Sequence, residues 1–224
     1  MGADMGTGMA TERRAAILEA AAGVIARRGV RGLRVADIAA EAGVSTALVY
    51  YHFKGRADIL RRTLEFISDR AQRYTAHHAR TEGAAVRVQA ANPPRSPRRE
   101  LERALLLELQ DRAEVRENST AWGELRASAV FDPELRTALS DARLRWIDAL
   151  ADTLGRIHRN APPTALTAAA ERLTATLEGL STRWLGGILP LPHARELLRE
   201  AIAVELSQLR RTTLGRTTLG RTTL

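Results

Sequence analysis

The sequence predicts an all-α protein of about nine helices. Alanine, leucine and arginine dominate, while aromatic residues make up only 4% of the chain, a composition that favours helix over sheet. Apolar residues recur at the three- and four-residue spacing of one helical face, and no segment shows the alternation expected of a strand. Capping residues, prolines and glycines separate these periodic segments and indicate where each helix starts and stops.

The N-terminal part of the chain predicts four helices. We expect three helices at residues 11–28, 35–41 and 46–53 and a long fourth helix after Gly55. Thr11 and Ser45 offer N-capping side chains for the first and third helices, whereas Arg34 offers none at the start of the second. Residues 1–10 are rich in Gly and Met without periodicity, so we expect them to be disordered.

Five further helices are predicted after a loop that begins near residue 83. Four of them have start signals, at Ser96-Pro97, Asp132-Pro133, Thr164 as a cap, and Pro190-Leu191-Pro192. The remaining helix is indicated by a periodic segment at about residues 115–130. The last fifteen residues repeat the unit Arg-Thr-Thr-Leu-Gly. Because five residues is neither a helical nor a strand period, residues 210–224 are expected to form a disordered low-complexity tail.

The net charge of +8 is unevenly distributed along the chain. Residues 1–62 carry ten basic and six acidic side chains, residues 63–209 carry twenty of each, and the last fifteen residues carry four arginines and no acid. A general preference for arginine over lysine explains the residue type, since Lys54 is the only lysine. It does not explain why the excess is localised. The pattern suits a basic, DNA-facing N-terminal module attached to a neutral domain.

Composition also excludes several kinds of protein and site. The chain has no cysteine, which excludes disulfides and metals bound by thiolates. No window approaches the roughly 18 uninterrupted apolar residues of a membrane span. The N-terminus lacks the basic stretch and apolar core of a secretory signal. We therefore expect a cytoplasmic protein without a membrane partner.

The stretch from Leu33 to Arg56, LRVADIAAEAGVSTALVYYHFKGR, has the spacing of a helix-turn-helix. Its turn is Ala42-Gly43-Val44, where glycine permits a positive φ that other residues resist. The residues expected to close a small core are Ile38, Ala39, Val44, Leu48, Val49 and Phe53, packed over Ile17 and Val24. Four side chains of the third helix are left without a core role: Thr46, Ala47, Tyr50 and Tyr51.

The run IAAEAGVSTALVYYHFKGRADIL resembles the signature of the TetR (tetracycline repressor) family in its A-G-V-S turn, its Tyr-Tyr-His-Phe run and the basic residue that follows. The resemblance covers about residues 11–60, including the stretch ILEAAAGVIARRG. It implies a sequence-specific transcriptional regulator, more often a repressor than an activator. It also implies a three-helix DNA-binding domain at 11–56, followed by a helical bundle for ligand binding and dimerisation at 57–209.

The resemblance also implies a set of DNA-binding residues: Arg34, Ser45, Thr46, Ala47, Tyr50, Tyr51, His52 and Arg56. Thr46 and Ala47 would face base edges, with Tyr50 at the groove. Tyr51, His52 and Arg56 would bind phosphates, and Arg34 stands where many members have a phosphate-binding threonine. Two alternatives remain open: the tyrosines pack against neighbouring helices, or His52 is an ordinary surface histidine.

A regulator of this kind is expected to act as a homodimer on an inverted-repeat operator in double-stranded DNA, with recognition helices about 34 Å apart. The apolar stripe of the last two long helices faces either the partner subunit or the chain's own core: Leu173, Leu177, Leu180, Ile202 and Leu206. Candidate lining residues for an unidentified small-molecule effector are Trp122, Phe131, Trp146 and Trp184. Each is equally compatible with an ordinary core position.

Two other functions compete with this interpretation. An enzyme is disfavoured because the five histidines (His52, His77, His78, His158 and His193) show no metal-binding spacing, and because no glycine-rich phosphate loop or nucleophile elbow occurs. We therefore expect no catalytic residues, metal or cofactor. A nonspecific architectural DNA-binding protein is the closer alternative, but it predicts basic charge along the whole chain.

Overall fold

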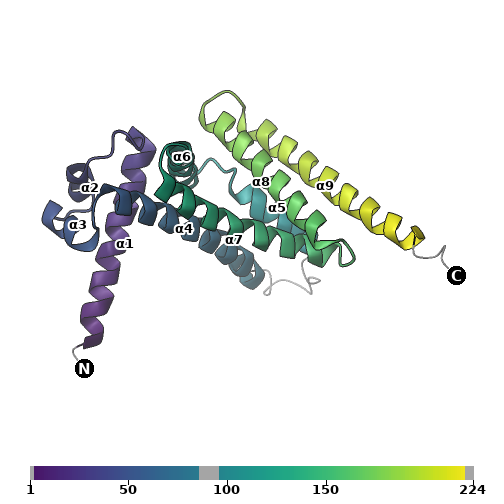
Figure 1. The fold of residues 1–224 in the computed structure, drawn as a ribbon, viewed down its shortest axis with the longest axis horizontal. Coiled ribbons are helices and arrows are strands. Elements are labelled where there is room, and N and C mark those ends of the chain that lie inside the picture. The colour runs from purple at the N-terminus through teal and green to yellow at the C-terminus, as the bar shows by residue number, and fades with distance from the viewer. Residues whose placement is uncertain (1–2, 86–95, 220–224) are drawn as a thin grey trace. The chain divides into compact units, whose positions relative to one another are not determined.

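The computed structural model describes the backbone of residues 3–85 and 96–219, and the side chains of residues 9–73 and 96–212. Within these ranges it contains nine helices and no strand, which confirms the predicted all-α class (Figure 1). The helices are α1 (Ala3–Arg28), α2 (Val35–Glu41), α3 (Thr46–His52), α4 (Arg56–Ala85), α5 (Pro97–Leu107), α6 (Ala113–Ser128), α7 (Pro133–Ile157), α8 (Pro163–Leu185) and α9 (Leu191–Leu219). No described helix is long and apolar enough to cross a membrane.

Both end segments are more helical than the sequence predicts. Helix α1 begins at Ala3 rather than at a Thr11 cap, and α9 continues to Leu219 through most of the repeated tail. Neither segment contains proline, and extending an existing helix costs little because each added residue gains a hydrogen bond. A glycine such as Gly215 costs only about 1 kcal/mol relative to alanine. Residues 1–2, 86–95 and 220–224, which include most of the predicted loop, lie outside the described ranges.

Two further predicted helix caps, besides that of Thr11, are not formed as expected. Helix α8 begins at Pro163, so Thr164 lies inside its first turn and is not the cap. Proline suits the first helical position because its φ is already fixed and no N–H donor is needed there. Ser96 does occupy the N-cap position of α5, but its hydroxyl makes no capping hydrogen bond.

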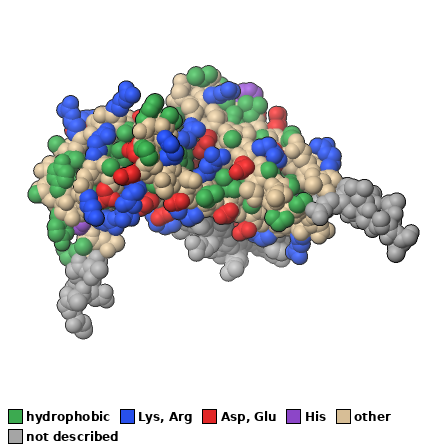
Figure 2. Space-filling model, viewed as in Figure 1, with side chains coloured by type: hydrophobic (Ala, Val, Ile, Leu, Met, Phe, Trp, Pro, Cys, Tyr) green, Lys and Arg blue, Asp and Glu red, His purple; other side chains and the backbone are tan. Residues whose placement is uncertain are grey.

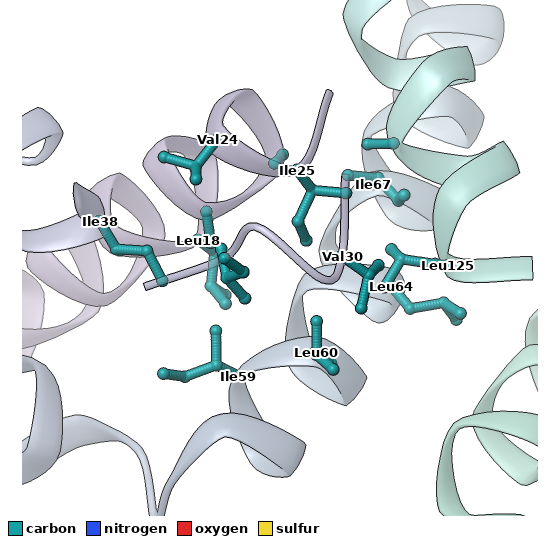
Figure 3. Close-up of a cluster of buried hydrophobic side chains, with 14 of the residues drawn as sticks. Leu18, Val24, Ile25, Val30, Ile38, Ile59, Leu60, Leu64, Ile67 and Leu125 are labelled. Carbon is teal, nitrogen blue, oxygen red and sulfur yellow. The ribbon is translucent and has the colours of Figure 1, made fainter. Parts of the chain in front are cut away.

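The helices form two compact units, and the first contains residues 1–73 and 112–142. Its core joins seven of the eight expected helix-turn-helix residues, all but the partly exposed Leu48, to side chains from α4 and α6, among them Ile59, Leu64 and Leu125. Figure 3 shows these side chains in one cluster with those of Val24, Ile25 and Ile38 from α1 and α2. The unit therefore extends well beyond residues 11–56, because the apolar faces of α4 and α6 are buried in the same core as α1.

The second unit contains residues 74–111 and 143–224. Helices α8 and α9 lie side by side in it (Figure 1), and Arg172 of α8 donates to both carboxylate oxygens of Glu205 on α9 at 2.7 Å. Arg195 of α9 donates to the carbonyls of Leu106 and Leu109 at the end of α5. These contacts fasten both α5 and α8 to α9.

The leucine stripe that the sequence offers as a dimer seam lies in the core of the second unit. Leu173, Leu177, Leu180, Ile202 and Leu206 are each at most 7% exposed and belong to one buried cluster. Side chains buried within one chain have little surface left for a partner. The alternative in which the stripe faces the chain's own core is therefore the one observed, and this set is corrected from dimer seam to core.

Candidate nucleic-acid interface

Helix α3 is held in place by its apolar side. Val49 is fully buried and Phe53, the C-cap residue, is 1% exposed, both within the core of the first unit. Ser45 caps the other end as predicted, its hydroxyl accepting the Leu48 N–H at 3.2 Å. Gly43 has a φ of +64°, which confirms the glycine turn between α2 and α3. The short helix is thus fixed at both ends.

The opposite side of α3 faces solvent. Thr46 and Ala47 are exposed, Tyr50 is 58% exposed and Tyr51 is 81% exposed. These values exclude the alternative in which the tyrosines pack against α1 or α4, because a packed ring would be buried. The Tyr51 ring meets the half-buried His52 edge-on at 5.2 Å between centroids. Polar and aromatic groups therefore gather on one solvent-exposed face of α3, beside small side chains that would let another molecule approach the helix backbone closely.

The loop between α1 and α2 is held through the peptide groups of a single residue. The Val30 N–H donates to Glu124 of α6 at 3.1 Å, and the Val30 carbonyl accepts from the Arg56 guanidinium. Neither contact could be read from the sequence, because the two partners lie 94 and 26 residues away. Together they fix the position from which α2, and with it α3, leaves α1.

Arg56 therefore has a structural contact that the sequence did not indicate. Its contact with Val30 uses part of a guanidinium that carries five N–H donors, so other donors stay available for an anion. Its phosphate contact stays a prediction.

Arg34 is exposed at the N-cap of α2 and makes no side-chain capping bond, as expected.

The start of α4 is fixed by Asp58, which accepts the Lys54 N–H at 3.1 Å and pairs with Arg61 at 2.6 Å. Burial acts to raise the pKa of Asp58. The backbone hydrogen bond from Lys54 and the charges of Arg61 and Arg62 outweigh it, so the pKa lies below its usual value. A carboxylate that stays ionised keeps the turn after α3 closed, with Lys54 exposed beside the tyrosines.

Most other charges near α2 are neutralised within the unit. Arg28 pairs with Asp37 at 2.6 Å, and Arg27 pairs with Glu41. Figure 2 shows basic and acidic side chains interspersed on the visible face. Net charge alone therefore does not mark the binding surface, and the exposed side of α3 does.

The four aromatic residues predicted to line an effector pocket are not brought together in one core. Trp146 and the buried Trp184 pack in the second unit, whereas Trp122 packs on the core of the first. Phe131 is 82% exposed in the turn between α6 and α7, where Asp132 caps α7 through the Leu135 N–H. An exposed ring lines no enclosed surface, so Phe131 is corrected to a surface residue.

Glu108 is a candidate binding residue that the sequence analysis missed. Its carboxyl, at the C-cap of α5, is only partly exposed, and burial raises its pKa to about 7. No cation among the described residues pairs with it. The signal was present in the sequence, since Glu108 interrupts the apolar run Leu105-Leu106-Leu107-Glu108-Leu109.

Metal-binding groups do not gather in the described part of the chain, where no three His, Asp or Glu residues lie close enough to hold an ion. The side chains of His77 and His78 lie outside the described ranges.

Two family profiles match the chain, one over the helix-turn-helix and one over the helices that follow. The profile described as "Bacterial regulatory proteins, tetR family" matches residues 17–63, and that of the "BetI-type transcriptional repressor, C-terminal" matches residues 97–207. A crystal structure from Rhodococcus sp., described as a TetR-family transcriptional regulator, shares 42% identity and superposes with a TM-score of 0.74. The alignment covers 88% of this chain and 99% of that one. The chain belongs to the TetR family.

Two further relatives of this TetR-family protein are informative. A transcriptional regulator from Saccharomonospora viridis, solved in complex with choline, shares 28% identity over 86% of this chain and 96% of its own, with a TM-score of 0.70. The regulator BetI of Agrobacterium fabrum is 28% identical over 178 residues, 79% of this chain and 78% of its own. The TetR family consists of transcriptional regulators rather than enzymes, and its DNA-binding profile spans the exposed face of α3.

Proposed function

We propose that this TetR-family protein is a repressor that binds an inverted-repeat operator as a homodimer and is released by a small-molecule effector. The observation that carries the proposal is the uncovered face of α3, where Thr46, Ala47, Tyr50 and Tyr51 are exposed while the opposite side is locked in the core. A helix presented in this way can enter the major groove and contact base edges with its first turn.

Selection from a random duplex DNA pool tests the DNA-binding proposal. At about 0.15 M salt, where distant phosphate attraction is screened, the wild type is expected to enrich a single inverted repeat. Tyr50→Ala is expected to weaken binding to that repeat by at least about fivefold, because disrupting recognition at one base pair of a specific site typically costs about 1–3 kcal/mol. The measurement is binding affinity by fluorescence anisotropy.

The control is Phe131→Ala, which removes an aromatic ring that is 82% exposed in the turn between α6 and α7, outside the helix-turn-helix stretch of residues 33–56. It is expected to retain wild-type affinity for the repeat. Equal binding of every duplex, with a steep salt dependence and no enriched sequence, would contradict specific regulation. It would favour the architectural alternative.

The dimer surface is proposed to be the outer face of α8 and α9. With their leucines turned into the core, these helices leave Ala175 and Gly179 of α8 and Ala203 and Val204 of α9 exposed. Val204 is 52% exposed, although its side chain is apolar. Small residues allow two helix pairs to approach closely, as in a four-helix bundle between subunits.

Gly179→Arg is expected to convert the dimer to a monomer without unfolding it. A Cβ added at Gly179 meets no atom within 4 Å in the chain, so the substitution leaves the subunit's own packing intact. The long side chain would block a partner helix at this surface. Sedimentation velocity gives the oligomeric state, and circular dichroism checks the fold.

The matched control is Gly123→Arg on α6, where an added Cβ also meets nothing within 4 Å. This variant is expected to remain dimeric. A Gly179→Arg protein that still sediments as a dimer would place the interface elsewhere.

The effector is proposed to be a small organic cation bound among the helices of the second unit. Glu108 offers a partly exposed carboxylate without a described counter-ion, and the Saccharomonospora viridis relative was solved with choline. Trp146 and Trp184 belong to the same unit, and aromatic faces attract cations. The effector would shift DNA binding by its differential affinity for two conformations of the protein.

A further inference from the structure

The excess positive charge of the N-terminal segment can be assigned to particular side chains. Arg27, Arg28, Arg61 and Arg62 pair with carboxylates, and Arg56 donates to a backbone carbonyl. Besides Arg56, the basic side chains of residues 9–62 that form no ion pair with another described residue are Arg13, Arg14, Arg31, Arg34 and Lys54. These six side chains carry the local surplus of positive charge that an anionic partner would meet.

Arg14 lies at the C-terminal end of α3, although it belongs to α1. Its guanidinium carbon is 5.7 Å from the centroid of the Phe53 ring, and Phe53 is the C-cap residue of α3. A guanidinium stacked over an aromatic face is oriented while its N–H donors remain at the edge. Arg14 is half-buried, so the position of its side chain is restricted. Tyr51 and Lys54, which precede and follow Phe53 in the sequence, are exposed.

Arg13 precedes Arg14 on α1, about 100° away around the helix, and is exposed. Counting 100° per residue, both side chains lie one helical turn before the buried Ile17 and Leu18, so both flank the side of α1 that packs in the core. Glu12, one residue before Arg13, forms no ion pair with either arginine among the described residues. Asp58, near the start of α4, is already paired with Arg61. No ion pair among the described residues therefore neutralises Arg13, Arg14 or Lys54.

We propose that Arg13 and Arg14 of α1 form, together with Lys54, a phosphate-binding cluster that grips the DNA backbone at the C-terminal end of α3. This inference rests on the proposed function, because it needs α3 to lie in the groove. The ligand is a backbone phosphodiester, recognised by charge and guanidinium N–H donors without regard to base sequence. Helix α1 thereby acts as a second DNA-contacting element in addition to its role in the core.

The salt dependence of DNA binding tests the cluster. For each phosphate contact removed, the slope of the logarithm of the binding constant against the logarithm of salt concentration falls in magnitude by about 0.9, and by about twice that for a dimer. Arg13→Ala and Arg14→Met are each expected to show this reduction on the selected operator. Arg14→Met keeps an unbranched side chain over Phe53, and Arg14→Lys is expected to restore most of the slope.

Arg143→Met is the control, since it removes an exposed arginine from α7. It is expected to leave the slope unchanged. Reduced slopes with the enriched repeat unaltered support the cluster. Unchanged slopes in both variants overturn it, and so does an altered repeat, which would mean that these arginines contact bases. If the wild type enriches no repeat, the proposed function fails, and the slopes measured on random duplex still decide the cluster.

Discussion

Phe53→Ala is expected to lower the free energy of unfolding of the first unit by about 3–5 kcal/mol, because truncating the ring removes both its burial and its contacts with the surrounding atoms. The ring is 1% exposed within the core of that unit. It also supports the Arg14 guanidinium. Urea denaturation followed by circular dichroism measures the change, and amide hydrogen exchange is expected to rise most in α2 and α3.

Tyr51→Ala is the matched control because it removes a neighbouring aromatic ring that is 81% exposed. Its cost is expected to stay within about 0.5 kcal/mol, as for most surface substitutions. Phe53→Leu, which preserves much of the volume, is expected to cost less than about 1.5 kcal/mol. Equal destabilisation by Phe53→Ala and Tyr51→Ala would mean that both rings support the core.

Glu108→Gln is expected to stabilise the protein at pH 8 and to have little effect at pH 4. Burial raises the pKa of the folded carboxyl to about 7, while the unfolded chain keeps a value near 4.5. Between these values the folded state binds more protons, so wild-type stability falls as the pH rises through this window. Above pH 7, ionisation of the buried Glu108 carboxyl lowers the free energy of unfolding by up to about 3 kcal/mol. Urea titrations at several pH values measure it.

Glu102→Gln is the control, because it removes a carboxylate from the same helix that pairs with Arg98 at 3.0 Å. The Glu102→Gln variant is expected to show the same dependence of unfolding free energy on pH as the wild type. Choline provides a second readout: it should raise the melting temperature of the wild type, and Glu108→Gln should abolish that shift. The uncharged isostere 3,3-dimethylbutan-1-ol should have no effect on either protein. A flat wild-type profile would remove the basis for the Glu108 assignment.

Local sequence signals predict the local features of the DNA-binding helices. The Ser45 cap, the Gly43 turn, the buried Val49 and Phe53 and the exposed tyrosines all depend on neighbours within one or two helical turns. Such short-range preferences can be read from spacing alone. The predicted helix order is also confirmed, because most boundaries carry a proline, glycine or capping signal, although Arg34 and Arg112 offer no cap at the starts of α2 and α6.

Features that depend on distant contacts could not be predicted in this way. An apolar stripe such as Leu173–Leu180 is the same in sequence whether it faces a partner or its own core. The aromatic residues suggested for one pocket divide between two cores, because chemical type does not specify location. Arg14 reaches α3 only through the packing of α1 against it. Periodicity identifies which side is apolar but not what covers it.

The way Val30 is held has a consequence for building chimeric regulators. Its N–H is bound by Glu124 of α6 and its carbonyl by Arg56 of α4, while Ala121 and Leu125 of α6 complete the core around α1. A hybrid that joins residues 11–56 to the C-terminal helices of another regulator would sever the bond to Glu124 and uncover apolar surface. The transplantable unit is therefore discontinuous in sequence, and a working exchange has to carry residues 112–142 along with the N-terminal helices.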